Sequence, residues 1–260
     1  MRAYCINLER RTDRRTHMVQ QFSRAGLDVT FLPAIDGKNS AIAEEAAGVA
    51  VGSNGRRIGA GAYACFQSHR TIWQCLVTGN DSHVLIFEDD MLLAEGLPAL
   101  LKADWIPPDA DIVKLEARLV RVQLGHKHDL PVGERSLYRL HSSHFGTGCY
   151  IISRGSAERL LKLTSRPADA IDELIFDDRS DIFKSLAIYQ MVPAPTIQGD
   201  RIQSGEIQTG WKATSIEQRF TDDAISEGNK KSFFDKVGRR LQAEVIALSN
   251  GWHYRYVRFG

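Results

Sequence analysis

Residues 3–35 read AYCINLERRTDRRTHMVQQFSRAGLDVTFLPAI, and their pattern of apolar and polar residues indicates the fold class. Residues 3–8 form a short apolar run that suits a buried strand, and residues 29–35 form a second one. Between them, Asp13 is placed to cap a helix that ends near Gly26. The apolar face of this helix is expected to be Met18, Val19, Phe22 and Ala25. A strand, a helix and a second strand in this order are the unit of a parallel α/β sheet.

The rest of the chain continues this alternation as far as about residue 192. A largely buried helix is expected over 62–77, a short helix over 98–103, and a helix capped by Ser153 that ends near residue 163. Further strands are expected over 83–87, 111–116, 137–140, 148–152 and 188–192. The basic, turn-rich residues 118–135 are expected to form a surface loop, and residues 38–60 a helix fragment and a loop.

Composition limits the classes of function. The chain has 260 residues, of which 43% are hydrophobic and 25% charged, which is typical of one large soluble domain or one domain with an appendage. The net charge of +1 offers no general attraction for nucleic acid. The four cysteines form no CxxC pair and sit in apolar segments, which indicates reduced thiols rather than disulfides or a zinc site.

Three adjacent carboxylates follow an apolar strand in VLIFEDD, residues 84–90. Ligands of open α/β sheets bind at the carboxyl ends of strands, and Mg²⁺ or Mn²⁺ prefers oxygen ligands. On an extended chain Glu88 and Asp90 point to the same side and are placed to share one ion, whereas Asp89 points away or bonds to nearby backbone. A solvated acidic turn is the alternative, and the triplet alone does not separate the two.

Four arginines surround the turn after the first strand, in INLERRTDRR, residues 6–15. Backbone N–H groups at a helix start and planar guanidinium groups both suit phosphate, although a basic helix face in water is the simpler reading of the outer members. The glycine-rich patterns of dinucleotide and ATP sites are absent from the sequence. At least one phosphate contact is expected here.

Two further segments carry polar residues in apolar surroundings. Ser68 and His69 lie in the helix expected over 62–77, where a lone histidine is more often structural than catalytic. Asp172 and Glu173 interrupt the apolar run AIDELIF, residues 170–176. A carboxylate there suits general base catalysis, or it complements the N-terminus of a helix.

Taken together, these features favour glycosyl transfer from a nucleotide-sugar. A cation neutralises the leaving diphosphate, and a base deprotonates an acceptor hydroxyl. Two rivals stay open. One is a metal-dependent phosphoesterase or nucleotide-sugar hydrolase, which usually needs more metal ligands than one triplet supplies. The other is a non-catalytic nucleotide-sugar-binding protein.

Six motifs in their order along the chain resemble glycosyltransferase family 25, which holds bacterial lipooligosaccharide and lipopolysaccharide glycosyltransferases and has collagen galactosyltransferases among its relatives. They are INLERRTDRR (6–15), AIDG (34–37), FQSHRTIW (66–73), LIFEDDM (85–91), GTGCYIIS (146–153) and AIDELIFD (170–177). The resemblance covers roughly residues 2–205 and implies a GT-A-like single domain with a Rossmann-like, mostly parallel central sheet. It also implies a UDP-linked hexose donor with galactose favoured, a Mn²⁺ or Mg²⁺ cofactor, a saccharide or glycolipid acceptor, and an inverting mechanism.

The resemblance also assigns roles, position by position. Glu88 and Asp90 match the DxD-like metal motif of the family, and Asp172 matches the acid that would act as the base. The nucleotide-sugar site is expected to include Asn7, Leu8, Arg10, Arg14, Asp36, Ser68, His69 and Asp89, with the role of Asp89 left open. One departure bears on sugar preference: the family usually has Gly-Glu-x-Gly-Cys before its Ser-His pair, and this chain has GAYAC at 61–65, without the carboxylate.

Residues 206–260 carry no family motif and are expected to form a helical extension packed on the domain of residues 1–205. A capping serine, Ser232, opens a helical pattern of apolar residues. The end of the chain, WHYRYVRFG, alternates aromatic residues and arginine, which fits either packing on the sheet or peripheral contact with an anionic inner-membrane surface. Neither a signal peptide nor a spanning segment is visible, so the expected location is cytoplasmic.

Overall fold

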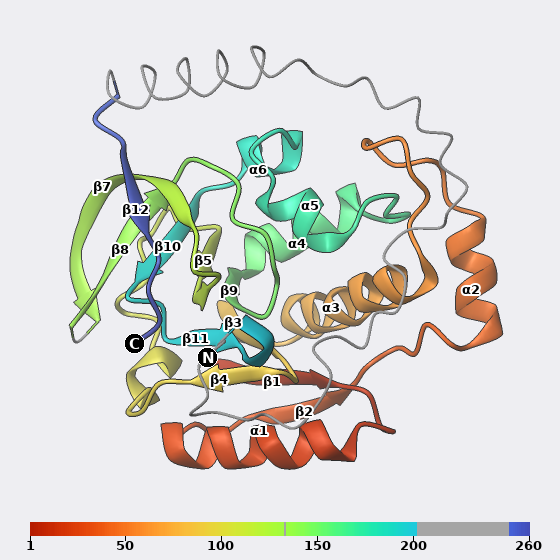
Figure 1. Cartoon of the computed structure of the whole chain (residues 1–260), viewed down its shortest axis with the longest axis horizontal. Coiled ribbons are helices and arrows are strands. Elements are labelled where there is room, and N and C mark those ends of the chain that lie inside the picture. Colours follow the sequence, from red (N-terminus) through yellow and green to blue (C-terminus); the bar gives the residue numbers. More distant parts are fainter. Residues whose placement is uncertain (133, 202–249) are drawn as a thin grey trace.

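A computed structural model describes residues 1–132, 134–201 and 250–260, and a nine-stranded sheet forms their centre (Figure 1). The strands lie in the order β12-β7-β8-β10-β5-β9-β3-β1-β2. They are β1 (Arg2–Asn7), β2 (Thr30–Pro33), β3 (His83–Glu88), β5 (Ile112–Lys114), β7 (Arg121–Val132), β8 (Arg135–Leu140), β9 (Cys149–Ser153), β10 (Ile188–Val192) and β12 (His253–Tyr256). β1, β2, β3, β5, β7 and β10 run in one direction, and β8, β9 and β12 in the other. The predicted α/β class with a mostly parallel central sheet is confirmed.

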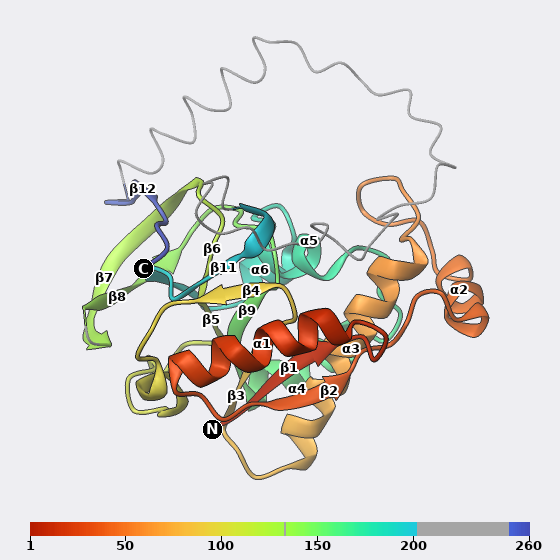
Figure 2. The same cartoon turned by 60° about the horizontal axis from the view of Figure 1, so that its bottom comes forward.

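Helices cover both faces of this sheet, and a second, three-stranded sheet lies beside it (Figures 1 and 2). The second sheet has the order β4-β11-β6. Its strands are β4 (Met91–Leu93), β6 (Glu116–Ala117) and β11 (Thr196–Gln198). The helices are α1 (Thr12–Ala25), α2 (Ser40–Ala47), α3 (Ala60–Thr78), α4 (Arg154–Leu163), α5 (Ile171–Phe176) and α6 (Asp181–Ser185), with short 3₁₀ helices η1 (Pro98–Leu101) and η2 (Gly199–Arg201).

The alternation of side chains along β3 builds two separate cores. Phe87 faces α1, where its ring lies 5.1 Å from the ring of Phe22 in an edge-to-face contact. Ile86 faces the other way and packs in the cluster of Phe66 and Trp73 from α3. Since all five side chains are buried, α1 and α3 are fixed against opposite faces of the same strand.

The first helix differs in two details from its prediction. Asp13 does not cap α1: Arg11 is the N-cap residue, and Asp13 is the second helical residue, paired with Arg11 at 2.7 Å. Val19 is 52% exposed and so does not belong to the apolar face, because it lies one position after the buried Met18 and is rotated toward solvent. The predicted end is confirmed, since Gly26 adopts a left-handed conformation with φ 70°.

The prediction of a surface loop over 118–135 is wrong. These residues hold β7 and the start of β8, which pair as an antiparallel hairpin at one side of the sheet. Val122 and Leu124 are fully buried, whereas Arg121 and His126 are exposed. Polar residues on the solvent side concealed the two-residue apolar period in the sequence. β4, β11 and α6 were not foreseen either, and the strand expected over 111–116 divides into β5 and β6.

The prediction for residues 206–260 can be compared with the structure only over residues 250–260. The helix expected from Ser232 lies in residues 202–249, outside the described ranges. The end of the chain is described, and β12 pairs antiparallel with β7 while Val257 is buried. WHYRYVRFG therefore packs against the sheet edge. Among the described helices, none has both the length and the apolar character needed to cross a bilayer.

Candidate functional site

A cavity of about 960 Å³ opens where β1 and β3 end, as expected for a ligand site of a parallel α/β sheet. Its walls come from the segments after β1, β2 and β3, the first half of α3, the 146–147 loop and the start of α5. The predicted site residues that line it are Leu8, Arg10, Arg14, Asp36, Ser68, Glu88, Asp89, Asp90 and Asp172. The other two, Asn7 and His69, are 2% and 0% exposed and contact members of that set from behind.

The last two residues of the acidic triplet, Asp89 and Asp90, share a hydrogen-bond donor that Glu88 does not use. β3 ends at Glu88, so the strand alternation used to orient Asp90 stops one residue short of it. Asp89 and Asp90 both accept hydrogen bonds from Nη1 of the buried Arg14, at 2.6 and 3.1 Å. Asn7 donates to Asp89 at 2.8 Å. The clearest task of Asp89 is therefore to hold Arg14 at the cavity wall and Asn7 behind it.

The charged form of the Asp90 carboxyl group is electrostatically unfavourable at this position. Burial, followed by the negative charge of Glu88, raises the pKa of Asp90 to about 8, although Arg14 opposes the shift. Its Oδ1 atom is buried and accepts no hydrogen bond within the described ranges. Asp200, from η2, lines the same cavity and raises the pKa of Asp90 further. A buried carboxylate oxygen without a donor, among carboxylates, fits a hard cation.

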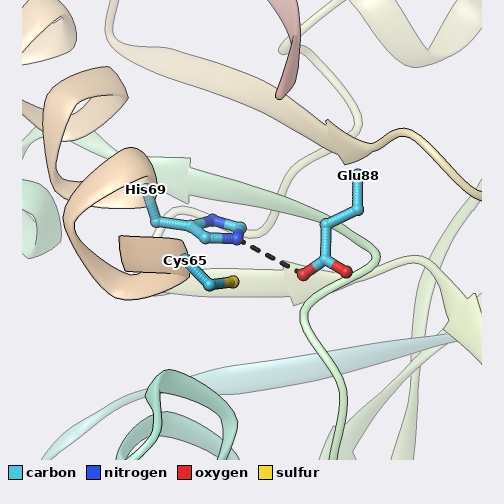
Figure 3. Close-up of side chains that lie close together, drawn as sticks. All are labelled: Cys65, His69 and Glu88. Carbon is cyan, nitrogen blue, oxygen red and sulfur yellow. Dashed lines mark hydrogen bonds and ion pairs between the residues drawn. The ribbon is translucent and has the colours of Figure 1, made fainter. Parts of the chain in front are cut away.

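Glu88 lies on the α3 side of the triplet. Its Oε1 accepts a hydrogen bond from the Thr147 hydroxyl at 2.6 Å and lies 3.4 Å from Nε2 of His69 (Figure 3). Burial raises the pKa of Glu88, but the contacts from His69 and Thr147 outweigh it, so the net direction is downward. Glu88 is therefore held as a carboxylate at the cavity wall.

The predicted phosphate-binding arginines have different positions. Arg14 is only 3% exposed and faces the triplet. Arg10 is on the cavity rim and donates two hydrogen bonds to Asp36, at 2.7 and 3.3 Å. The hydrogen bonds from Arg10 lower the pKa of Asp36. Arg10 is thus the more accessible of the two for an anionic ligand.

Ser68 and His69 connect elements more than they face the cavity. The Ser68 hydroxyl accepts a hydrogen bond from the Ile35 backbone N–H at 2.9 Å and donates one to the Ala64 carbonyl at 2.8 Å. His69 Nδ1 lies 3.0 Å from the Tyr150 hydroxyl. The Ser-His pair therefore ties α3 to the segment after β2 and to β9. Ala62, at the position where the sequence resemblance implies glutamate, lines the cavity, so α3 itself contributes no carboxylate to it.

Asp172 lies in the first turn of α5 and is 4% exposed. Its Oδ2 accepts a hydrogen bond from the Gly146 backbone N–H at 3.1 Å, and its Oδ1 one from the Glu173 N–H at 3.0 Å. The side chain therefore complements a helix start, as one reading of the sequence expects, and also lines the cavity. The reading of Asp172 as an acid at a helix start is therefore confirmed, whereas its role as a base stays a prediction.

Two buried charged residues that the sequence did not single out support the 146–148 loop. Lys114 Nζ donates to Glu116 Oε2 at 3.2 Å and to the Gly146 carbonyl, and Glu116 Oε2 also accepts from the Gly148 N–H at 3.1 Å. Gly146 has a φ of 89°, and a Cβ there would come within 2.7 Å of the Glu116 carboxylate. The pair thus holds the loop whose Thr147 contacts Glu88 and whose Gly146 contacts Asp172.

Removal of one member of this pair should be costly. Both side chains are 0% exposed, so Lys114→Met leaves Glu116 without its amine partner in the core. We expect the free energy of unfolding to fall by on the order of 3 kcal/mol, as measured by urea denaturation. Lys102→Met, at an exposed site, is the control and should change it by about 0.5 kcal/mol or less. Equal effects of both variants would contradict the assigned role.

Comparisons with known proteins identify relatives of this chain. The model of glycosyltransferase family 25 (LPS biosynthesis protein) matches residues 1–175. Lipooligosaccharide biosynthesis protein lex-1 of Haemophilus influenzae is 35% identical over 149 residues, which are 53% of this chain and 49% of that protein. The match therefore spans about half of the length of that relative.

Longer matches are found in Neisseria. Lacto-N-neotetraose biosynthesis glycosyltransferase LgtE of Neisseria gonorrhoeae is 30% identical over 207 residues, covering 75% of this chain and 72% of that protein. The solved galactosyltransferase LgtC aligns over 64% of this chain and 63% of its own, at 12% identity and a TM-score of 0.36. On the family match and the LgtE relationship, this chain belongs to glycosyltransferase family 25.

Proposed function

We propose that this protein is a metal-dependent, inverting glycosyltransferase that moves a hexose from a UDP-sugar to a saccharide acceptor. The observation that carries the proposal is that one cavity is lined by the Glu88–Asp90 carboxylates, by Arg10 and by Asp172. Its volume of about 960 Å³ lies in the range of ligand-binding pockets. Donor diphosphate, cation and acceptor hydroxyl each find a matching group in it.

Glu88 and Asp90 are the residues that would hold the cation. The fit rests on their oxygen donors, on the buried Asp90 Oδ1 atom and on the raised pKa of Asp90. When bound, a divalent cation supplies positive charge against the diphosphate leaving group. Arg14 holds Asp89 and Asp90 in place from behind, and Arg10 on the rim offers a second positive charge to the diphosphate.

Asp172 is the proposed base. The acceptor hydroxyl oxygen attacks the anomeric carbon of the sugar, the bond from that carbon to the diphosphate oxygen breaks, and the hydroxyl proton passes to Asp172. One displacement of this kind inverts the anomeric configuration. The backbone N–H groups of Gly146 and Glu173 orient the carboxylate for the transfer.

The substrate classes follow from the family and its named members. Relatives named for lipooligosaccharide and lacto-N-neotetraose biosynthesis support a lipooligosaccharide or lipopolysaccharide saccharide as the acceptor. Galactose is the favoured sugar on the family resemblance, with the alanine at position 62 as the feature most able to change it. A cytoplasmic location, with peripheral contact to a membrane that carries a glycolipid acceptor, is part of the same proposal.

A donor screen tests the proposal. Thermal unfolding is followed with UDP-, GDP-, CMP- and dTDP-sugars, each with and without Mn²⁺. At about 100 times the dissociation constant, UDP-galactose with Mn²⁺ should raise the melting temperature by roughly 5 °C or more. Stabilisation by every nucleotide alike, or none by a UDP-sugar, would count against the donor.

The rival functions give different products. A nucleotide-sugar hydrolase releases free sugar at full rate without any acceptor, and a binding protein gives stabilisation without turnover. Transfer that requires a saccharide acceptor distinguishes the proposed function from both.

A further inference from the structure

Three different ligand types meet at the α3 side of the cavity. Cys65 and His69 lie one turn apart on α3, and Glu88 ends β3 opposite them (Figure 3). One atom from each, a sulfur, an imidazole nitrogen and a carboxylate oxygen, lies within 4.8 Å of the other two. Residues four apart on a helix share one face, so the helix presents both of its ligands to Glu88 together.

Neighbouring side chains already orient two of these ligands. His69 Nδ1 lies 3.0 Å from the Tyr150 hydroxyl, which also accepts a hydrogen bond from Trp73 Nε1 at 3.0 Å, and the His69 and Tyr150 rings stack at 5.6 Å. Thr147 donates to Glu88 at 2.6 Å. When a metal ion is bound, the proton of neutral His69 would lie on Nδ1, facing the Tyr150 hydroxyl, and Nε2 would be the ligand atom. Outer partners that fix a histidine and a carboxylate in this way are typical of metal centres.

The donor set selects a different ion from the acidic triplet. Sulfur and imidazole nitrogen favour Zn²⁺, whereas Mg²⁺ and Mn²⁺ favour oxygen ligands. Cys65 and Glu88 line the cavity, and His69 is fully buried behind them. Three protein ligands on one wall leave the fourth position of a tetrahedral ion open to the cavity.

We propose that Cys65, His69 and Glu88 bind one Zn²⁺ ion at a site separate from the hard-cation pair Glu88–Asp90 but sharing Glu88 with it. Binding breaks the Cys65 S–H bond, forms a zinc–sulfur bond and releases one proton to the buffer, with no change of oxidation state. Because Glu88 is common to both sites, bound Zn²⁺ competes with Mn²⁺. The binding itself is independent of the transferase function, whereas inhibition by zinc rests on it.

Cobalt is a spectroscopic probe of this site. The full chain, freed of metal with a chelator, is titrated with Co²⁺, and a thiolate-to-cobalt absorption band should saturate at one equivalent and disappear on addition of Zn²⁺. Cys65→Ser should abolish the band, and His69→Gln should weaken Co²⁺ binding by more than about 100-fold, because loss of an outer partner of a ligand alone costs about 10- to 100-fold. Cys75→Ser, a second partly exposed cysteine of α3, is the matched control and should keep the band.

A measurement on the unaltered chain guards against misfolded variants. Alkylation mapped by mass spectrometry should show Zn²⁺ protecting Cys65 but not Cys75. A hydrogen-bonded His69–Glu88 pair without affinity for metal predicts neither the band nor the protection, and that result would overturn the proposal.

Failure of this site and failure of the proposed function can be told apart. Asp90→Asn removes a ligand of the hard cation only, so it should lose the stabilisation by Mn²⁺ and keep the cobalt band. A band that disappears in Asp90→Asn would contradict the proposal, because it would show that cobalt binding by Cys65 requires Asp90 and that the two sites are not separate.

Discussion

Asp172→Asn is expected to abolish sugar transfer while leaving donor binding intact. Asparagine keeps the size of the side chain and one carbonyl oxygen for the Gly146 N–H, but it cannot take the proton of the acceptor hydroxyl. Removal of a general base typically costs about 10²- to 10⁴-fold in rate. The turnover number should fall by that factor, and the UDP-sugar should still raise the melting temperature as it does for the unaltered protein.

Glu173→Gln is the matched control for this experiment. Glu173 is the next residue of α5, but its carboxylate accepts a hydrogen bond from Asn54 at 3.0 Å on an exposed side of the protein. Its substitution should leave turnover within about twofold, since surface changes of this kind shift free energies by about 0.5 kcal/mol or less. Unchanged transfer in Asp172→Asn would remove Asp172 as the base.

Asp90→Asn is expected to remove the dependence on the divalent cation. The substitution takes away one of two proposed carboxylate ligands, and the charge stabilisation of a metal is worth several kcal/mol. Turnover at saturating Mn²⁺ should therefore fall by about 10³-fold. Thermal unfolding with and without Mn²⁺ should then give the same melting temperature.

The metal-free state separates loss of a ligand from loss of the fold. In the unaltered protein, burial and Glu88 raise the pKa of Asp90 to about 8, which means that the charged form is disfavoured in the folded state. A neutral asparagine removes that cost, so metal-free Asp90→Asn should be at least as stable as the unaltered protein near pH 8. A variant that is inactive and also unstable without metal would point to misfolding instead.

Glu95→Gln serves as the control for Asp90→Asn. Glu95 follows β4 on the same segment and is exposed. Its substitution should change neither turnover nor the effect of Mn²⁺. Full transferase activity in the presence of EDTA, for the unaltered protein, would contradict the metal assignment altogether.

Many of the helices and strands could be predicted from the sequence because they depend on the local spacing of apolar residues. Apolar runs at residues 3–8 and 83–87 correspond to β1 and β3, and the helical spacing over 62–77 to α3. Because the strands end where the polar residues begin, the sequence also placed the arginines and the acidic triplet near one cavity. The hairpin of β7 and β8 was not predicted because its solvent side is rich in charged residues and turn formers.

The chain alone thus determined the α/β class, the order of the family motifs and the strand ends that carry the carboxylates. Only the tertiary structure decided the partners: Arg14 for Asp89 and Asp90, His69 and Thr147 for Glu88, and Gly146 for Asp172. It alone revealed the buried Lys114–Glu116 support and brought Asp200 to the triplet. The physical reason is that periodicity and strand ends depend on neighbours in sequence, whereas burial and hydrogen-bond partners depend on packing between segments that lie tens of residues apart.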